Sequence, residues 1–331
     1  MASVLARAAS AAVLALAAPD ASSSRYEFEE PHMGTLVRLV LFADDVGAAK
    51  AAARAAFDRV AELDGALSDY RDTSEVSGLA RAAGGPAVPV GADLFALLER
   101  ARDLWVRSGG AFDVTVGPAV RLWRRTLRTG DWPDPARREE ALALVGTDKV
   151  HLDAAARAVR LERAGMGIDL GGIAKGYAGD EALRVLRSRG TPRALVAVGG
   201  DVVAGEAPPG GAGWLVAVAA AEGGAGGERL LVRDAAVSTS GDAEQWIARD
   251  GVRYSHILDP RTGIGLTGRR QVTVLAPEGV TADGLATAAC VLGAGPGLAL
   301  VEASPGAAAI VFEEGAGTRA SRGWTSLPRA H

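Results

Sequence analysis

Two adjacent glycines, Gly171 and Gly172, separate two apolar patterns, and Lys175 follows them by about one helical turn. Apolar residues alternate over 166–170, which predicts a strand, and recur at helical spacing over 173–189, which predicts a helix ending at the next glycine. Glycines let a ligand approach the backbone, and the first amides of a helix attract anions. The pattern indicates a phosphate or pyrophosphate site, and the alternative is a tight turn without a ligand.

The lysine strengthens the ligand interpretation. Only three of the 36 Lys and Arg residues are lysines, so Lys175 stands out in a chain that otherwise uses arginine. Lysine carries a compact charge that suits contact with a phosphate. The segment is not a P-loop, because Gly176 follows Lys175 where Ser or Thr is required, and it lacks the glycine spacing of a dinucleotide fingerprint.

A second pair of polar residues lies near the start of a predicted helix. Asp283 and Thr287 are four residues apart, so their side chains share one helix face. A carboxylate and a hydroxyl are hard oxygen ligands, which Mg²⁺ takes together with water and substrate phosphates. The alternative is that Thr281 caps the helix and that the negative charge of Asp283 interacts favourably with the positive end of the helix dipole.

One of four histidines, His256, lies at the end of a predicted strand, ahead of an Asp-Pro turn. A histidine at a strand end beside a polar loop can act as a general base. The alternative is a structural histidine.

The remaining pattern mixes strands and helices without strict alternation, which predicts an α+β fold. The segment 109–123 reads as a loop because glycines and a proline bracket it. Predicted helices cover 47–67, a short segment capped by Thr73 or Ser74, 92–110, 139–146, 281–293 and 295–303. Predicted strands cover 33–43, 193–205, 213–220, 271–277 and 308–314, with hairpins over 151–165 and 244–258.

Composition excludes several classes of function. The 331 residues are 48% hydrophobic and can bury one large core or two fused halves. The net charge of -4 and the lack of basic runs interleaved with aromatics argue against nucleic acid as a partner. The single cysteine, Cys290, lies in an apolar run that predicts a buried core residue, so neither an internal disulfide nor a cysteine zinc site can form.

The N-terminal residues 1–22 resemble a secretory signal, with one arginine, an apolar stretch and a small-residue cleavage site at 15–17. The stretch is too short for a membrane span, and no cysteine follows it for lipid attachment. We therefore expect a periplasmic or exported protein. The alternatives are a disordered tail or an early start codon on a cytoplasmic protein.

Eight sequence blocks occur in an order that resembles the ApbE family of FAD:protein FMN transferases, over about residues 33–292. The blocks are MGT from Met33, LSDYRDTSEVSGL from Leu67, GGAFDVTVGP from Gly109, IDLGGIAKGYAGD from Ile168, VGGDV from Val198, STSGD from Ser238, YSHILDPRTG from Tyr254 and ADGLATA from Ala282. The resemblance implies one ApbE-like (T-fold-like) domain over residues 25–331, with mixed sheets flanked by helices and an FAD cleft between two halves.

The resemblance also implies a reaction. In this family the FMN moiety of FAD passes to a threonine hydroxyl of an acceptor protein of the electron-transport type, forming a phosphoester and releasing AMP with the help of Mg²⁺. The alternatives are an FAD pyrophosphatase that gives FMN and AMP, and a non-catalytic flavin carrier.

Family positions map onto residues of this chain. The resemblance places Mg²⁺ on Asp283, Thr287 and the backbone oxygen of Gly172, and His256 is our candidate for the base. Flavin contacts map onto Met33, Tyr70, Ala111, Phe112, Asp113, Asp169, Lys175 and Ile257.

Overall fold

The central sheet is built from strands whose side chains enter two separate cores. The computed structural model describes residues 23–218, 227–242 and 245–329. In β2 (Thr35–Ala43), Leu39 and Leu41 enter one hydrophobic core, whereas Val40 enters another. Successive side chains of a strand point to opposite faces, so both faces of this sheet are covered. The other strands are β1 (Ser24–His32), β6 (Ala194–Val198), β7 (Asp201–Ala204), β10 (Ala235–Gly241), β14 (Arg270–Ala276), β15 (Ala308–Glu313) and β16 (Gly317–Ala320).

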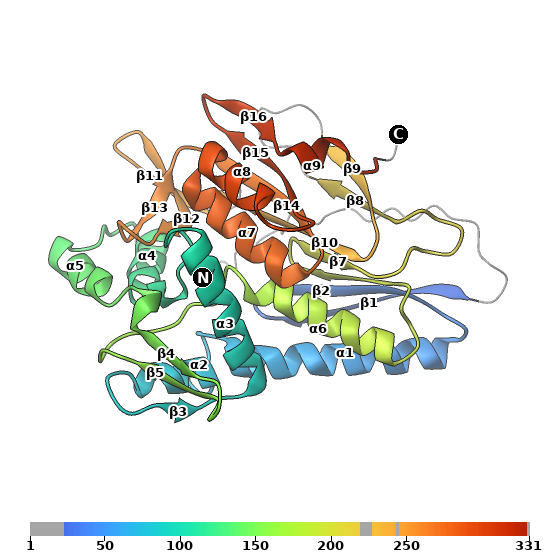
Figure 1. Ribbon diagram of the computed structural model, residues 1–331, viewed down its shortest axis with the longest axis horizontal. Helices are drawn as coiled ribbons and strands as arrows, with labels where there is room; N and C mark the ends of the chain where they lie inside the picture. The colour runs from blue at the N-terminus through green and yellow to red at the C-terminus, as the bar shows by residue number, and fades with distance from the viewer. Residues whose placement is uncertain (1–22, 219–226, 243–244, 330–331) are drawn as a thin grey trace.

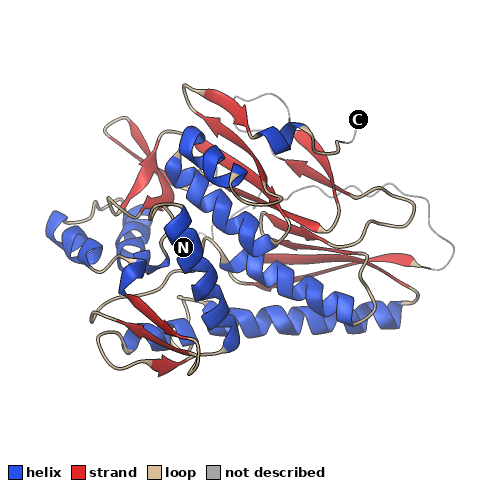
Figure 2. Ribbon diagram, viewed as in Figure 1, coloured by secondary structure: helices blue, strands red, loops and turns tan. Residues whose placement is uncertain are grey.

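These eight strands form one sheet in the order β1-β2-β6-β7-β10-β14-β15-β16, and every neighbouring pair is antiparallel (Figure 1). Helices lie together along one face (Figure 2). The opposite face carries a pair of short antiparallel strands and a helical turn, and Trp214 and Trp324 are buried there. The helices are α1 (Val46–Leu67), α6 (Ala174–Ser188), α7 (Gly279–Leu292) and α8 (Ala294–Glu302), and the opposite layer is β8 (Trp214–Val218), β9 (Glu228–Val232) and α9 (Arg322–Thr325).

Two smaller sheets and further helices extend the molecule beyond one end of the main sheet (Figure 1). One sheet is β11 (Trp246–Arg249), β12 (Val252–Asp259) and β13 (Ile264–Thr267), and the other is β3 (Val88–Pro89), β4 (Val150–Asp153) and β5 (Ala158–Leu161). The helical elements are α2 (Glu75–Arg81), α3 (Ala92–Arg107), η1 (Val114–Val116), α4 (Gly117–Thr129), α5 (Pro135–Ala143) and η2 (Thr147–Lys149). Within the described residues, every helix falls short of the length and apolar character that crossing a membrane requires.

The structure confirms the α+β class and most of the expected elements. Ser74 caps α2 by accepting the N–H of Ser77 at 3.0 Å. Asp250 and Gly251 both have positive φ at the turn of the β11–β12 hairpin, as two-residue hairpin turns require. Parts of the expected strand 213–220 and hairpin 244–258, and the signal-like segment 1–22, lie outside the described residues.

Two expectations were wrong. Residues 166–170 belong to no strand, and Asp169 donates its N–H to the Val114 carbonyl at 2.7 Å instead of joining a ladder. The segment 109–123 is not all loop, because α4 begins at Gly117. Pro118 lies in the first turn of α4, where a helix needs no N–H donor and tolerates proline.

The helices α6 and α7 cross with their backbones in close contact. A Cβ on Gly279 would lie 2.5 Å from the carbonyl oxygen of Gly176, and a Cβ on Gly176 would lie 2.8 Å from the Cβ of Asp283. Only glycines permit this approach. Cys290, which lies on α7, is 1% exposed, and burial raises the pKa of its thiol to about 12.

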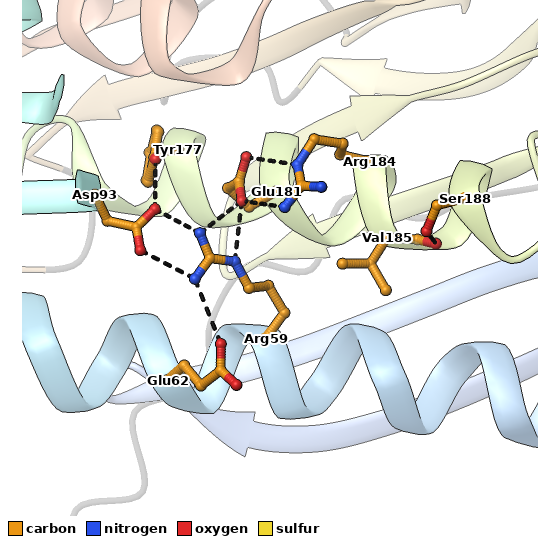
Figure 3. Close-up of polar contacts among 8 residues, drawn as sticks. All are labelled: Arg59, Glu62, Asp93, Tyr177, Glu181, Arg184, Val185 and Ser188. Carbon is orange, nitrogen blue, oxygen red and sulfur yellow. Dashed lines mark hydrogen bonds and ion pairs between the residues drawn. The ribbon is translucent and has the colours of Figure 1, made fainter. Parts of the chain in front are cut away.

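A partly buried ion-pair network joins α1, α3 and α6 (Figure 3). Arg59 on α1 donates to Asp93 on α3 at 3.0 Å and to Glu181 on α6 at 2.6 Å, and the Tyr177 hydroxyl donates to Asp93 at 2.7 Å. Burial opposes ionisation of Asp93, but hydrogen bonds from Arg59 and Tyr177 outweigh it and lower the pKa of Asp93. Hydrogen bonds from Arg184 and then Arg59 lower the pKa of Glu181.

Replacing Arg59 by Met is expected to lower the free energy of unfolding at pH 7 by about 2 kcal/mol, because Asp93 and Glu181 each lose a charged hydrogen-bond donor and keep only Tyr177 and Arg184, respectively. The folded pKa values of Asp93 and Glu181 lie below their unfolded values, so the stabilisation is complete above about pH 4 to 5 and is lost as the pH falls further. Urea unfolding of both proteins at pH 7 and pH 3.5 measures this. Arg102→Met, at an exposed position of α3, is the control. A wild-type advantage that persists unchanged at pH 3.5 would contradict the assignment.

Candidate functional site

Asp283 lies on the buried face of α7, where it is 2% exposed. One carboxylate oxygen accepts the N–H of Gly176 from α6 at 3.0 Å. The helix that carries Asp283 starts at Gly279, and its first amides donate to the carboxylate of Asp180, at 2.6 Å from Gly279 and 2.8 Å from Val280. The alternative interpretation, in which Thr281 caps this helix, is therefore wrong, and a carboxylate from α6 fixes the position of α7 instead.

Lys175 on α6 binds a buried carboxylate that sequence reasoning missed. Its ammonium lies 2.5 Å from Asp201 at the start of β7, and Asp201 also accepts a hydrogen bond from the Ser238 hydroxyl. Burial lowers the pKa of Lys175, but the charges of Asp201 and Asp283 outweigh that effect and raise it. The lysine is therefore charged. The sequence did contain a signal for Asp201. This acidic residue begins an otherwise apolar strand, β7, and a charge that is buried in such a strand needs a partner.

Lys175, Asp201 and Asp283 form a cluster of two carboxylates and one cation, so the cluster has one negative charge in excess when both carboxylates are ionised. Burial raises the pKa of Asp283, the charge of Asp201 raises it further, and Lys175 opposes both. A buried carboxylate with incomplete neutralisation favours the approach of a cation.

Thr287 lies one turn beyond Asp283 and faces the glycine turn. A Cβ on Gly172 would lie 2.9 Å from the Thr287 hydroxyl oxygen and 3.3 Å from the ring of Phe112. The Thr287 hydroxyl is 3.2 Å from that of Ser240 on β10. The structure thus places the Gly172 backbone beside Thr287 and puts the Asp283 carboxylate on the same helix as Thr287.

These donors fit a magnesium ion. A carboxylate, a hydroxyl and a backbone carbonyl are hard oxygen ligands, and Mg²⁺ commonly takes one or two carboxylates and completes its shell with water and substrate phosphates. Across residues 23–218, 227–242 and 245–329, no group of three or more His, Cys, Asp or Glu side chains is arranged to hold a metal.

A second polar cluster adjoins the glycine turn. Asp169 accepts the N–H of Gly171 at 2.7 Å and a hydrogen bond from Arg124 on α4 at 2.8 Å. Arg124 also pairs with Asp69, and its guanidinium lies 4.5 Å from the ring centroid of Tyr70, which is 76% exposed. Tyr70 and Asp169 were expected contacts of the flavin. Arg124 was not expected there, because the helix that carries it, α4, was not predicted.

The segment 111–113 is buried beside the glycine turn. Ala111, Phe112 and Asp113 are 2%, 4% and 7% exposed. The Asp113 carboxylate accepts hydrogen bonds from the N–H and hydroxyl groups of Thr115 and Thr147, at 2.5 to 3.1 Å. These bonds hold η1 against η2, so in this structure the Asp113 side chain organises the segment that brings Phe112 to Gly172.

His256 lies on β12, a strand that packs against α7, and its side chain is exposed. Its Nδ1 is 3.3 Å from the carbonyl oxygen of Gln245. The next residue, Ile257, is half-buried against the main core. Met33 has a φ of 52° in the turn between β1 and β2 and packs against the same core. None of these contacts joins His256 or Met33 directly to the Asp283 cluster.

The model of the ApbE family matches residues 33–312. The chain belongs to the ApbE family. An FAD:protein FMN transferase from Treponema pallidum is 36% identical over 315 residues, which cover 90% of this chain and 87% of that protein. The crystal structure of the Pseudomonas stutzeri flavinyl transferase ApbE in its apo form has a TM-score of 0.83 at 30% identity and covers 93% of this chain and 98% of that one.

A flavin transferase ApbE from Vibrio cholerae also has a TM-score of 0.83, at 28% identity, and covers 92% of this chain and 99% of that one. These matches span nearly the whole of both chains, so the ApbE fold extends over both the large sheet and the smaller sheets.

Proposed function

We propose that this protein transfers the FMN moiety of FAD to a threonine hydroxyl of an acceptor protein in an Mg²⁺-dependent reaction that releases AMP. The chain is a flavin transferase of the ApbE family. The observation that carries the metal-dependent chemistry is the buried Asp283 one turn before Thr287, with the Gly172 backbone beside that threonine.

The residues of the cluster have distinct tasks in this proposal. Asp283, Thr287 and the Gly172 carbonyl would hold Mg²⁺, whose charge would stabilise the developing charge on the pyrophosphate. Lys175 supplies a fixed positive charge, since Asp201 holds its ammonium and keeps it protonated. In phosphoryl-type transfer an enzyme mainly aligns the attacking and leaving oxygens and neutralises charge, and this arrangement suits that task.

The test follows both products. The protein is incubated with FAD and Mg²⁺, with and without a fragment of a threonine-flavinylated acceptor, and AMP release and covalently bound flavin fluorescence are measured. Fluorescence fixed to the fragment is expected. AMP and free FMN in both tubes would indicate a pyrophosphatase instead, and intact FAD in both tubes would indicate a carrier.

His256→Ala is expected to slow FMN transfer about a hundredfold while changing the dissociation constant of FAD little, because a general base acts on the incoming hydroxyl and not on FAD. Single-turnover transfer and FAD titration measure the two effects. His151→Ala, at an exposed histidine on β4, is the matched control. Equal losses in transfer and in binding would make His256 a binding residue.

We also propose that the protein is exported, on the basis of the signal-like residues 1–22. Mass spectrometry of the protein purified from its native host is expected to give a mature chain that starts after the cleavage site at 15–17. An intact Met1 would contradict export through this segment.

A further inference from the structure

Arg124 on α4 is the centre of a polar cluster that contains Asp69, Tyr70 and Asp169. Arg124 reaches Asp69 with one terminal nitrogen and Asp169 with the other, at 2.8 Å. Its guanidinium also covers the ring of Tyr70, with 4.5 Å between the Cζ atom and the ring centroid. One side chain therefore contacts an exposed aromatic ring and a buried carboxylate.

Tyr70 has the features of a stacking platform. The residue is 76% exposed, although its ring is large and lies beside a buried site. Arg124 lies over one face of the ring, so the opposite face is accessible to a planar ligand. An aromatic ring held in this way stacks on flavin or adenine rings without further side-chain ordering.

Asp169 has a different role in the cluster. Its side chain is 9% exposed and accepts hydrogen bonds from both Arg124 and the N–H of Gly171, the latter at 2.7 Å. Gly171 precedes Gly172, whose backbone lies beside Thr287. Asp169 therefore fixes the glycine turn, and Arg124 fixes Asp169.

We propose that Arg124 is a positioning residue that couples the two ends of the substrate site. It holds the Tyr70 ring as a platform for an aromatic ring of FAD and, through Asp169 and Gly171, it holds the Gly172 carbonyl in place for the divalent cation. This inference rests on the proposed function, since FAD and a divalent cation are its ligands. Arg124 is suited to the task because only a planar guanidinium can bridge two carboxylates and cover a ring together.

The first test measures FAD binding in EDTA by flavin fluorescence, so that no metal contributes. Arg124→Met and Tyr70→Leu are each expected to weaken binding about tenfold, in the range that base stacking supplies. The double variant is expected to weaken it by about the same factor, because Arg124 acts through Tyr70. A hundredfold loss in the double variant, or no loss in Arg124→Met, would overturn the platform role.

The second test measures Mn²⁺ binding without nucleotide by electron paramagnetic resonance. Arg124→Met is expected to weaken Mn²⁺ binding about tenfold, as the loss of an outer-shell partner does, and Tyr70→Leu is expected to leave it unchanged. Unchanged Mn²⁺ binding in Arg124→Met would overturn the coupling. Arg125→Met is the matched control. Arg125 is the next residue of α4 and its side chain is 58% exposed, so the substitution removes the same charge without disturbing the cluster.

A structural failure must be separated from a loss of positioning. Thermal unfolding is measured for every variant, and Arg124→Lys serves if Arg124→Met does not fold. Lysine keeps a cation beside Asp169 but cannot cover the ring and bridge both carboxylates, so Mn²⁺ binding is expected to recover more than FAD binding. Wild-type values for both ligands in Arg124→Lys would overturn the inference.

The two proposals fail in different ways. Transfer of FMN by the wild type with unchanged FAD and Mn²⁺ binding in Arg124→Met would refute the inference alone. Binding that depends on Arg124 without AMP release by the wild type would refute the proposed function alone. A wild type that binds no FAD would refute both.

Discussion

Replacing Asp283 by Ala is expected to reduce Mg²⁺-dependent AMP release and FMN transfer about a thousandfold or more. Asp283 is the single carboxylate among the proposed metal ligands, and a metal ion contributes several kcal/mol of charge stabilisation to such a reaction. Each 1.4 kcal/mol corresponds to about a tenfold change in rate. AMP release at saturating FAD across an Mg²⁺ titration measures the loss.

Two variants separate the loss of the ligand from a loss of structure. Asp283→Asn keeps the shape of the side chain and an acceptor for the Gly176 N–H, so it is expected to fold like the wild type and still lose turnover. Asp103→Asn on α3, where the carboxylate side chain is 65% exposed, changes the net charge equally and is expected to be fully active. Wild-type turnover in Asp283→Ala would contradict the assignment of the metal to this site.

Replacing Gly176 by Ala is expected to lower the free energy of unfolding by about 3 kcal/mol, because the new methyl group would meet the Gly279 carbonyl and the Asp283 Cβ. Backbone cannot yield as a flexible side chain can, so α6 and α7 must separate. This separation would also move Asp283 away from the glycine turn, and turnover is expected to fall even where the protein remains folded. Urea unfolding and AMP release are measured on the same preparation.

The matched control for this prediction is Gly65→Ala in α1. A Cβ at Gly65 would meet no atom within 4 Å, so alanine there is expected to stabilise the protein by roughly 0.5 to 1 kcal/mol through helix propensity. If Gly176→Ala were as stable and as active as Gly65→Ala, the close approach of the two helices would have no role in the site.

Local patterns predicted much of the fold. The helix after the glycine turn was placed well because its apolar period is regular and Gly190 ends it with a φ of 79°. The helix α4 was missed because its Gly-Pro start resembles a loop, although proline is favoured in the first turn of a helix. Missing α4 also meant missing Arg124.

The site depends more on contacts between segments that are distant in sequence. The pairing of Lys175 with Asp201 joins α6 to β7, and no local pattern records which strand lies beside a helix. Asp180 caps α7 from another helix, 99 residues away from the amide of Gly279, so a search for a cap next to the helix start selects Thr281 instead. Contacts of this kind, between segments that are distant in the sequence, could be identified only in the folded structure.

The buried thiol of Cys290 makes the wild-type chain a ready background for site-specific labelling. Maleimides and iodoacetamides react with accessible thiolates. Cys290 is 1% exposed and the pKa of its thiol is raised to about 12, so almost no accessible thiolate is present. A cysteine introduced at an exposed position, such as Trp246 on the β11–β12 hairpin, would then be the only reactive one. A fluorophore at that position could report the arrival of an acceptor protein beside the strand that carries His256.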